Sequence, residues 1–526
     1  MSTKPPTYGP DSHSASVQEH REPSLARRIA FTAIIVVSVL WVANRGVEWS
    51  ERRGYVDTQR PAETVQFLDE PAFELDGHTF RTSSYGEGTL VSSEFAANKA
   101  DRFRVFVLGG SFAMGTPYVN GESPQHGMEG GIASWLQAHL SHRFPQSTLE
   151  LVNAAAGGQN ARRVREIALE VLELEPDLLL VATGNNEGNL DPSLVQAELR
   201  KLGGYRLLRK LLLGSASKSG SWFTQQNPDT SAIANQFRGH ISAILDAAQA
   251  RGVPVLLCTL PVHLSYLGFE PGHVITGTQW PPMGGPCEDG LRAFEAGDYA
   301  GSLGPLQLCI DGPAAHQPPP VRSYLALAKL ELGQPDAGPL EILEEERGEC
   351  IARGISSYYR GKYRAARKSL RRCDEIADAL LWIGRANRKL GDPEAARNAM
   401  AQSVELVPRN RTRPSFNAIL REEATERPGV FLVDLERAAE ELSPDGIPGP
   451  SLFLDYSHMH WWGYAAMADV VLAKMREFGL EPAEPPTLAP PPDRRSLARA
   501  FRLPPLPASA HPLPPPATIS ATDLTP

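Results

Sequence analysis

The sequence predicts an α/β fold, in which a parallel β-sheet is sandwiched by helices and a helical segment is inserted into the domain. Short apolar runs alternate with amphipathic segments from residue 101 to about 270, as in parallel sheets covered by helices. From 286 to 408 this alternation gives way to short helical patterns with recurring glycines, and from 409 to 478 it returns. The predicted parts are therefore 101–285 and 409–478 for the sheet domain, and 286–408 for the insertion.

Length and charge narrow the classes of function. With 526 residues, the chain can form two or three domains. A net charge of −9 provides no overall basic field, so we do not expect nucleic acid as a partner. The cysteines lack metal-ligand spacing and their odd number does not decide the redox compartment; they are Cys258, Cys287, Cys309, Cys350 and Cys373. We expect no metal and no cofactor.

The N-terminal region predicts a membrane anchor. Residues 1–28 are polar and are expected to be a disordered tail. The 15 residues Ile29–Ala43 carry no charge, and arginines lie on both sides. A signal-peptide core and a buried helix are alternatives, but an uncleaved single-span anchor at 29–47 is favoured. The α/β domain would then be periplasmic, joined to the membrane by a lead-in at 48–100.

The predicted strands and helices of the first part alternate along the chain. Apolar, β-branched runs predict strands at 104–108, 149–153, 178–182 and 253–259. Amphipathic segments predict helices at 131–143, 161–174 and 231–251. In the lead-in, apolar and polar residues alternate over 73–80, as in a strand of a hairpin.

Glycines punctuate the insertion at intervals of 36, 28 and 30 residues, at Gly297, Gly333, Gly361 and Gly391. Around the last two, small residues fall in matching places: Gly354, Ala366 and Cys373, then Gly384, Ala396 and Ser403. This pattern resembles the tetratricopeptide repeat, although the usual period is 34. The resemblance implies a surface for a protein partner; an irregular helical bundle is the alternative.

After the insertion, the chain predicts a helix at 413–426, a strand at 430–434 and a final amphipathic helix at 463–478. Residues 481–526 hold 14 of the 46 prolines and show no hydrophobic period. We therefore expect an extended or disordered tail at 479–526.

Candidate catalytic groups follow the predicted strands. Ser111 comes directly after Gly109-Gly110, where a strand ends and a helix begins; a plain Gly-rich turn with Ser111 as N-cap is the alternative. Asp455 and His458 are three residues apart, so a turn can let the carboxylate orient the imidazole. The segments 153–158 and 184–187 can supply backbone and side-chain N–H donors.

This order of motifs resembles the SGNH (GDSL-type) esterase and lipase family, whose fold is a flavodoxin-like sheet. The resemblance implies that Ser111 is the nucleophile, that Gly158 and Asn186 complete an oxyanion hole with the N–H of Ser111, and that His458 is the base oriented by Asp455. A closer likeness is to bacterial, membrane-anchored members with embedded tetratricopeptide repeats. Gly109-Gly110-Ser111-Phe112 and Gly184-Asn185-Asn186-Glu187 depart from the family motifs but retain the reactive groups.

The resemblance implies a serine esterase that hydrolyses an O-acyl ester, with a cell-envelope glycan or lipid as a candidate substrate. An O-acyltransferase would use the same residues. A degenerate scaffold that binds proteins through its repeats is the other alternative.

Several nearby residues admit more than one role. His460 is a rival base, although a surface or substrate-pocket role is preferred, and His263 is expected to have a structural or rim role and not a catalytic one. Glu187 is expected to cap the helix that follows it or to pair with Arg162 or Arg163. Trp461, Trp462 and the segment 264–285 are candidates for shaping the substrate pocket.

Overall fold

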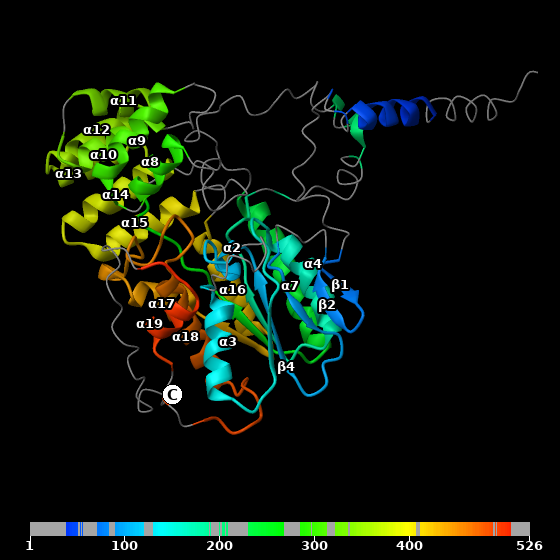
Figure 1. Cartoon of the computed structure of the whole chain (residues 1–526). Coiled ribbons are helices and arrows are strands. Elements are labelled where there is room, and N and C mark those ends of the chain that lie inside the picture. Colours follow the sequence, from blue (N-terminus) through cyan, green and yellow to red (C-terminus); the bar gives the residue numbers. More distant parts are fainter. Residues whose placement is uncertain are drawn as a thin grey trace, which may run out of the picture. The chain divides into compact units, whose positions relative to one another are not determined.

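The computed structural model describes residues 38–50, 53, 55, 71–83, 90–119, 130–188, 190, 199, 202–205, 207–208, 230–267, 285–295, 297–312, 321–334, 337–406, 411–487, 490 and 492–505 (Figure 1). The chain divides into two compact units, one of residues 1–62 and 192–216 and another of residues 63–191 and 217–526.

In the smaller unit, residues 38–50 are helical. The side-chain oxygen of Asn44 accepts a hydrogen bond from the N–H of Gly204 at 2.9 Å. Of the anchor expected at 29–47, residues 29–37 lie outside the described residues. No helix in the described ranges has the length and hydropathy that a membrane crossing requires.

In the larger unit, the described strands include five that form one parallel sheet. In spatial order they are β5 (Leu149–Asn153), β4 (Phe103–Gly109), β6 (Leu178–Ala182), β7 (Val255–Cys258) and β8 (Val430–Val433). The first strand of this sheet along the chain, β4, thus lies between its second and third strands, β5 and β6. This is the doubly wound, flavodoxin-like order, which opens a ligand crevice at the carboxyl ends of the strands beside β4. The predicted parallel α/β sheet is confirmed.

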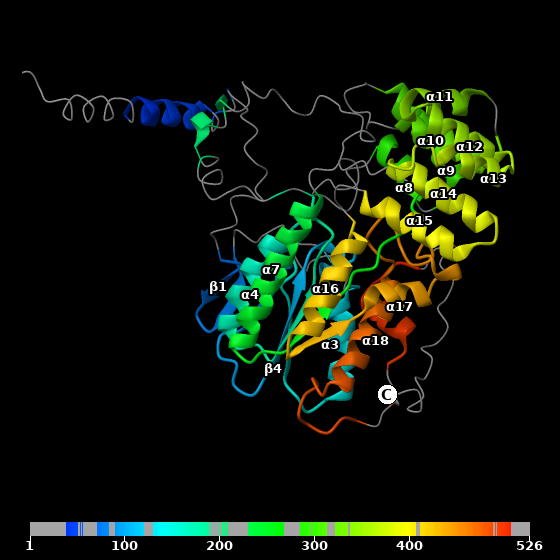
Figure 2. The same cartoon turned by 180° about the vertical axis from the view of Figure 1, so that it is seen from behind.

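Helices cover both faces of this sheet (Figures 1 and 2). Along β4, Val105 and Val107 face one core and Phe106 and Leu108 face the other, as the period of two in a strand requires. The first core is covered by α3 (Ile132–Arg143), α17 (Leu435–Glu441) and α18 (Trp461–Glu477). The second is covered by α4 (Ala161–Val171), α7 (Thr230–Ala250) and α16 (Pro414–Glu426).

A small antiparallel sheet precedes the main one. It contains β1 (Phe73–Asp76), β2 (Thr79–Thr82) and β3 (Glu94–Ala96). The single strand expected at 73–80 is divided by a turn in which Gly77 has a φ of 62°. Phe73 and Phe95 pack on Phe106 of β4, so the lead-in joins the hydrophobic core of the main sheet.

Between β7 and α16 the described helices form four pairs. They are α8 (Pro286–Glu295) with α9 (Tyr299–Asp311), α10 (Val321–Glu331) with α11 (Ala337–Arg347), α12 (Glu349–Tyr359) with α13 (Tyr363–Leu370), and α14 (Ala377–Lys389) with α15 (Pro393–Glu405). Each pair is joined by a turn that holds one of the recurring glycines at a φ between 71° and 79°. Such positive φ values favour glycine, which explains the recurrence seen in the sequence.

Close packing within the pairs also repeats. A Cβ added at Gly290 would lie 2.8 Å from Leu306, one at Gly354 would lie 2.4 Å from Leu370, and one at Gly384 would lie 2.5 Å from Met400. In each case the partner follows the glycine by 16 residues on the second helix of the pair. The glycines therefore allow the paired helices to approach closely.

Disulfides reinforce two of these pairs. Cys287–Cys309 joins α8 to α9, and Cys350–Cys373 joins α12 to the turn after α13. Cys258, on β7, is a buried free thiol.

The tail differs from the expectation of disorder at 479–526, because its described part folds back on the sheet domain. Helix α19 (Arg494–Ala500) is followed by Phe501, whose ring contacts that of Trp135 on α3 at 5.1 Å. The indole of Trp461 donates to the carbonyl of Pro504 at 2.9 Å. A few apolar side chains thus anchor a segment whose proline content indicated disorder.

Candidate active site

Ser111 lies where β4 passes into the short helix α2 (Ser111–Met114). Gly109, the last residue of β4, allows this strand to end close to β6, since a Cβ at this position would lie 2.0 Å from the carbonyl oxygen of Ala182. Gly110 follows, and a Cβ there would lie 2.9 Å from the side-chain nitrogen of Asn186. As the first residue of a helix, Ser111 has an N–H without a helical partner.

His458 lies in a turn that is organised by the carboxylate of Asp455. Oδ1 of Asp455 accepts hydrogen bonds from the backbone N–H groups of Ser457 at 2.8 Å and His458 at 2.7 Å. Its other oxygen, Oδ2, lies 2.7 Å from Nδ1 of the His458 ring. One carboxylate therefore fixes both the backbone and the side chain of His458.

The turn brings His458 to Ser111, although the two residues are 347 positions apart. Nε2 of His458 lies 2.8 Å from Oγ of Ser111. Because the carboxylate can only accept, Nδ1 of the imidazole carries the hydrogen and Nε2 presents its lone pair to the serine hydroxyl. The hydroxyl thus donates to a nitrogen able to take its proton.

Asp455 is held in its charged form. Burial acts to raise its pKa, but the electrostatic attraction of the His458 ring and the hydrogen bonds from His458 and Ser457 outweigh burial, so the pKa lies below its ordinary value. Its side chain is 3% exposed, whereas that of His458 is 14% exposed. The carboxylate is thus shielded from water, while part of the imidazole is accessible.

Asn186 and Gly158 lie in the loops after the strands on either side of β4. The side-chain nitrogen of Asn186 donates to the carbonyl of Gln159 at 2.9 Å, which leaves its second amide hydrogen for another acceptor. Gly158 adopts a φ of 69° with open space where a side chain would be. Gln159 orients Asn186 but was not among the predicted residues, because a backbone carbonyl leaves no signal in the sequence.

Glu187 and Asn185 have structural partners. Oε1 of Glu187 accepts from the N–H of Ala161 at 2.7 Å, at the start of α4. This helix precedes Glu187 in the chain, whereas the expectation was a cap on the helix that follows or a pairing with Arg162 or Arg163. The side-chain oxygen of Asn185 accepts from the hydroxyl of Thr412. Both residues fix the loop that presents Asn186.

The other two histidines considered lie elsewhere. Nε2 of His460 donates to the carbonyl of Pro450 at 3.1 Å, and its ring stacks on Trp462. His263 is buried, which lowers its pKa to about 3 and keeps the ring neutral at neutral pH. Its ring contacts those of Tyr266 and Phe453.

The tryptophans and the segment 264–285 were expected to shape a substrate pocket. Trp461 and Trp462 are both buried in the core between α3 and α18. Residues 268–284 lie outside the described residues.

Within the described ranges, no three or more His, Cys, Asp and Glu side chains are arranged to hold a metal ion.

The arrangement has the parts that nucleophilic acyl transfer needs: a hydroxyl, a nitrogen base in contact with it, a carboxylate that orients the base, and N–H donors at the same sheet edge.

No protein-family model matches this chain, and neither does any curated protein. Among solved structures it is similar to LAE5, an α/β-hydrolase enzyme from the metagenome of Lake Arreo, Spain. That similarity has 20% sequence identity and a TM-score of 0.17, and it covers 29% of this chain and 75% of LAE5.

Proposed function

We propose that the protein is a serine ester hydrolase of the SGNH type. The observation that carries the proposal is the continuous contact from Asp455 through His458 to Ser111, with distances of 2.7 and 2.8 Å. It occurs at the carboxyl end of β4, where a doubly wound sheet binds its ligands. The resemblance of the motifs in the sequence points to the same family.

In the proposed reaction, Oγ of Ser111 attacks the carbonyl carbon of an ester as its proton passes to Nε2 of His458. The carbonyl oxygen becomes an oxyanion, stabilised by the N–H groups of Ser111 and Gly158 and by the side-chain amide of Asn186. The intermediate collapses, and the alcohol leaves with the proton from His458. Water, deprotonated by His458, then attacks the acyl-enzyme and releases the acid.

Hydrolysis of p-nitrophenyl acetate by the purified full chain tests this proposal. We expect Ser111→Ala and His458→Ala to lower kcat by roughly 10⁴-fold or more, because the two residues act as a unit. Asn186→Ala should lower it by roughly 10²–10³-fold, as the loss of one oxyanion donor does. His460→Ala is the matched control and should retain most activity, since Nε2 of His460 is hydrogen-bonded to Pro450.

Two outcomes would contradict the proposal. Turnover by Ser111→Ala at the wild-type rate would remove the serine as nucleophile. Loss of activity in His460→Ala together with full activity in His458→Ala would show that His460, and not His458, is the base.

A further inference from the structure

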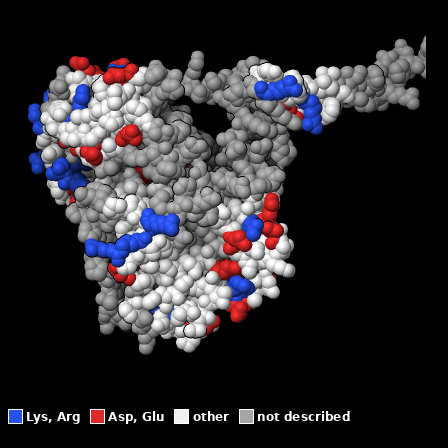
Figure 3. Space-filling view, in the orientation of Figure 1, with Lys and Arg blue, Asp and Glu red and all other residues white. Residues whose placement is uncertain are grey.

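The chain returns from the helical insertion to the sheet domain through a short buried segment, residues 411–413, which follows α15 and precedes α16. Thr412 is 1% exposed, and its neighbours Arg411 and Arg413 are 5% and 1% exposed. Figure 3 shows Lys and Arg spread over the surface of one face, as is usual for these residue types. Two buried arginines on either side of a buried threonine therefore indicate a segment that is fixed inside the fold.

Hydrogen bonds on both sides hold this segment in place. On the side of the insertion, Glu405 at the end of α15 accepts from the backbone N–H of Ser415 at 3.0 Å and from its hydroxyl at 2.7 Å. On the side of the sheet, the side chain of Asn417 accepts from the N–H of Leu260 and donates to its carbonyl, both at 2.9 Å. The segment is thus tied both to the insertion and to the residues that follow β7.

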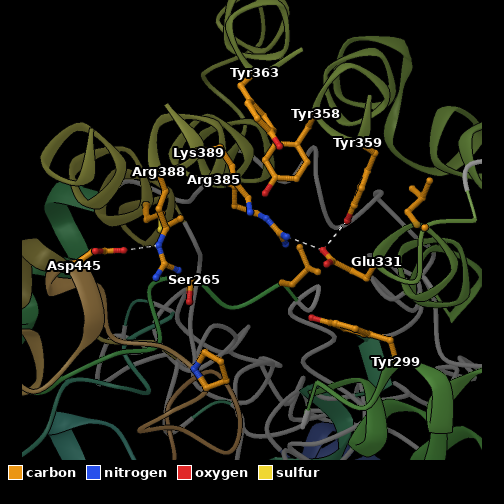
Figure 4. A pocket seen from close by; sticks show the side chains of 15 residues that line it. Ser265, Tyr299, Glu331, Tyr358, Tyr359, Tyr363, Arg385, Arg388, Lys389 and Asp445 are labelled. Atoms are coloured by element: carbon orange, nitrogen blue, oxygen red, sulfur yellow. Dashed lines mark hydrogen bonds and ion pairs between the residues drawn. The ribbon is translucent and has the colours of Figure 1, made fainter. Parts of the chain in front are cut away.

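The helix pairs are themselves joined to the sheet domain (Figure 4). Arg388 of α14 donates to Asp445 at 2.8 Å. Within the insertion, Arg385 and Tyr359 donate to one carboxylate oxygen of Glu331 at 2.6 and 2.7 Å. Buried apolar side chains also join the two parts; they are Met400 and Val404 of α15 with Val262, Leu264 and Ile447. The insertion therefore gives the segment 411–413 a fixed support.

The side chain of Thr412 contacts the loop that carries Asn186. Its hydroxyl donates to the side-chain oxygen of Asn185, which is 4% exposed. Among the described residues, this hydroxyl is the one hydrogen-bond partner of the Asn185 side chain. The methyl group of Thr412 also lies against the loop, since a Cβ added at Gly184 would be 3.3 Å from it. A buried amide with one partner is held in place only while that partner is present.

The two residues that follow Asn185 are held by a different part of the chain. Asn186 donates to the carbonyl of Gln159, and Glu187 accepts from the N–H of Ala161. Both partners follow β5, one edge strand of the sheet, whereas Thr412 precedes β8, the other edge strand. The loop is thus held by two separate parts of the chain, and Thr412 belongs to the part that leaves the insertion.

We propose that Thr412 is a positioning residue, which keeps the side-chain amide of Asn186 where the oxyanion forms. The inference rests on the proposed esterase function and adds a role for the helical insertion, because the segment that leaves it supplies this hydroxyl. Thr412 acts through Asn185 on the adjacent Asn186. An oxyanion donor contributes only within hydrogen-bonding distance, so a displaced loop lowers the rate while the fold persists.

Thr412→Val tests this role, because valine has the shape of threonine and lacks the hydroxyl. For hydrolysis of p-nitrophenyl acetate by the full chain, we expect kcat to fall about tenfold to hundredfold and KM to change less than about twofold, since the donor acts in the transition state. Thr412→Ser keeps the hydroxyl and should retain kcat within about threefold. In an Asn186→Ala background, Thr412→Val should cause no further loss, because both changes remove the same donor.

Asn185→Ala removes the same hydrogen bond from its other end and should lower kcat to the same extent. It provides a second variant if Thr412→Val does not fold. Thr259→Val is the matched control, because Thr259 is also fully buried and its hydroxyl donates to Asp434 at 2.8 Å, outside the loop that carries Asn186. This control should unfold at a lower temperature and keep kcat within about threefold.

Hydrogen exchange followed by mass spectrometry measures the loop without turnover. In Thr412→Val, and not in Thr412→Ser, the amides of residues 184–188 should exchange about tenfold faster, while those of β5 and β6 stay unchanged. Wild-type exchange at 184–188 in Thr412→Val would overturn the inference, as would a loss of kcat that multiplies with that of Asn186→Ala.

Hydrolysis by the wild-type chain keeps the two proposals separate. A wild-type chain that does not hydrolyse the ester would refute the esterase. Hydrolysis by the wild-type chain with an equally fast Thr412→Val would refute the positioning role alone. An equal loss of kcat in Thr259→Val and Thr412→Val would also refute it, because the loss of any buried hydroxyl would then have the same effect.

Discussion

Gly110→Ala isolates the contribution of Asn186 without touching a reactive group. Gly110 has a φ of −89° and a ψ of −157°, which alanine also adopts, so the backbone is not strained. The added Cβ would lie 2.9 Å from the Asn186 side-chain nitrogen. To reach an ordinary contact of 3.4 Å, the amide must retreat by about 0.5 Å. An oxyanion donor acts only within hydrogen-bonding distance, so this displacement removes much of its effect.

We therefore expect kcat to fall by roughly 10²–10³-fold, or about 2.7–4 kcal/mol of transition-state stabilisation, with little change in KM. Steady-state hydrolysis of p-nitrophenyl acetate measures both constants. The double variant with Asn186→Ala should be no slower than Asn186→Ala alone, because both changes remove one donor.

Gly239→Ala is the matched control. Gly239 lies within α7, and nothing lies within 4 Å of an added Cβ. This change should keep kcat and stabilise the helix by up to about 1 kcal/mol. A Gly110→Ala enzyme with kcat within threefold of wild type would refute the role of Asn186, as would a double variant in which the two losses multiply.

Two further predictions concern His263 and the cysteines. In the unfolded chain His263 becomes protonated below its ordinary pKa of 6.5, whereas in the folded chain it does so only near pH 3. As the pH falls between these two values, the free energy of unfolding should therefore decrease by up to about 1.4 kcal/mol for each pH unit. Denaturant unfolding at pH 6.5 and 5 should show a smaller loss in His263→Phe, and equal losses in both proteins would contradict the assignment. We propose that the chain folds outside the cytoplasm, as its two disulfides favour. Chain isolated from its cells without reductant and then denatured should expose one thiol, that of Cys258, and five reactive thiols would contradict this location.

The sequence was most informative where periodicity and burial coincide. The strands predicted at 149–153 and 178–182 have the bounds of β5 and β6. Residues 178–182 are a continuous apolar run, as in a strand that is buried on both faces. The recurring glycines of the insertion marked the turns of its helix pairs, since each requires a positive φ. The motif around Ser111 and the Asp455–His458 spacing indicated residues that the structure brings into contact.

Contacts between distant segments could not be predicted in this way. Glu331, Tyr359 and Arg385 are on three different helices, and no local pattern relates them. An odd number of cysteines left the disulfide pairs open. The tail was expected to be extended or disordered because of its proline content and the lack of a hydrophobic period. The contact of Phe501 with Trp135 joins residues that are remote in the sequence, so no local pattern indicated it.

The position of the helix pairs between β7 and β8 has a consequence for synthesis on the ribosome. The serine is made 347 residues before the histidine that contacts it. At roughly 5–20 residues per second, translation separates the two by roughly 20 to 70 s. The sheet lacks its edge strand β8 until Val433 has been made, and Ser111 lacks its contact with His458 until the later residue has been made. The contact between Ser111 and His458 therefore forms only after the helix pairs have emerged, and a chain that terminates before His458 lacks it.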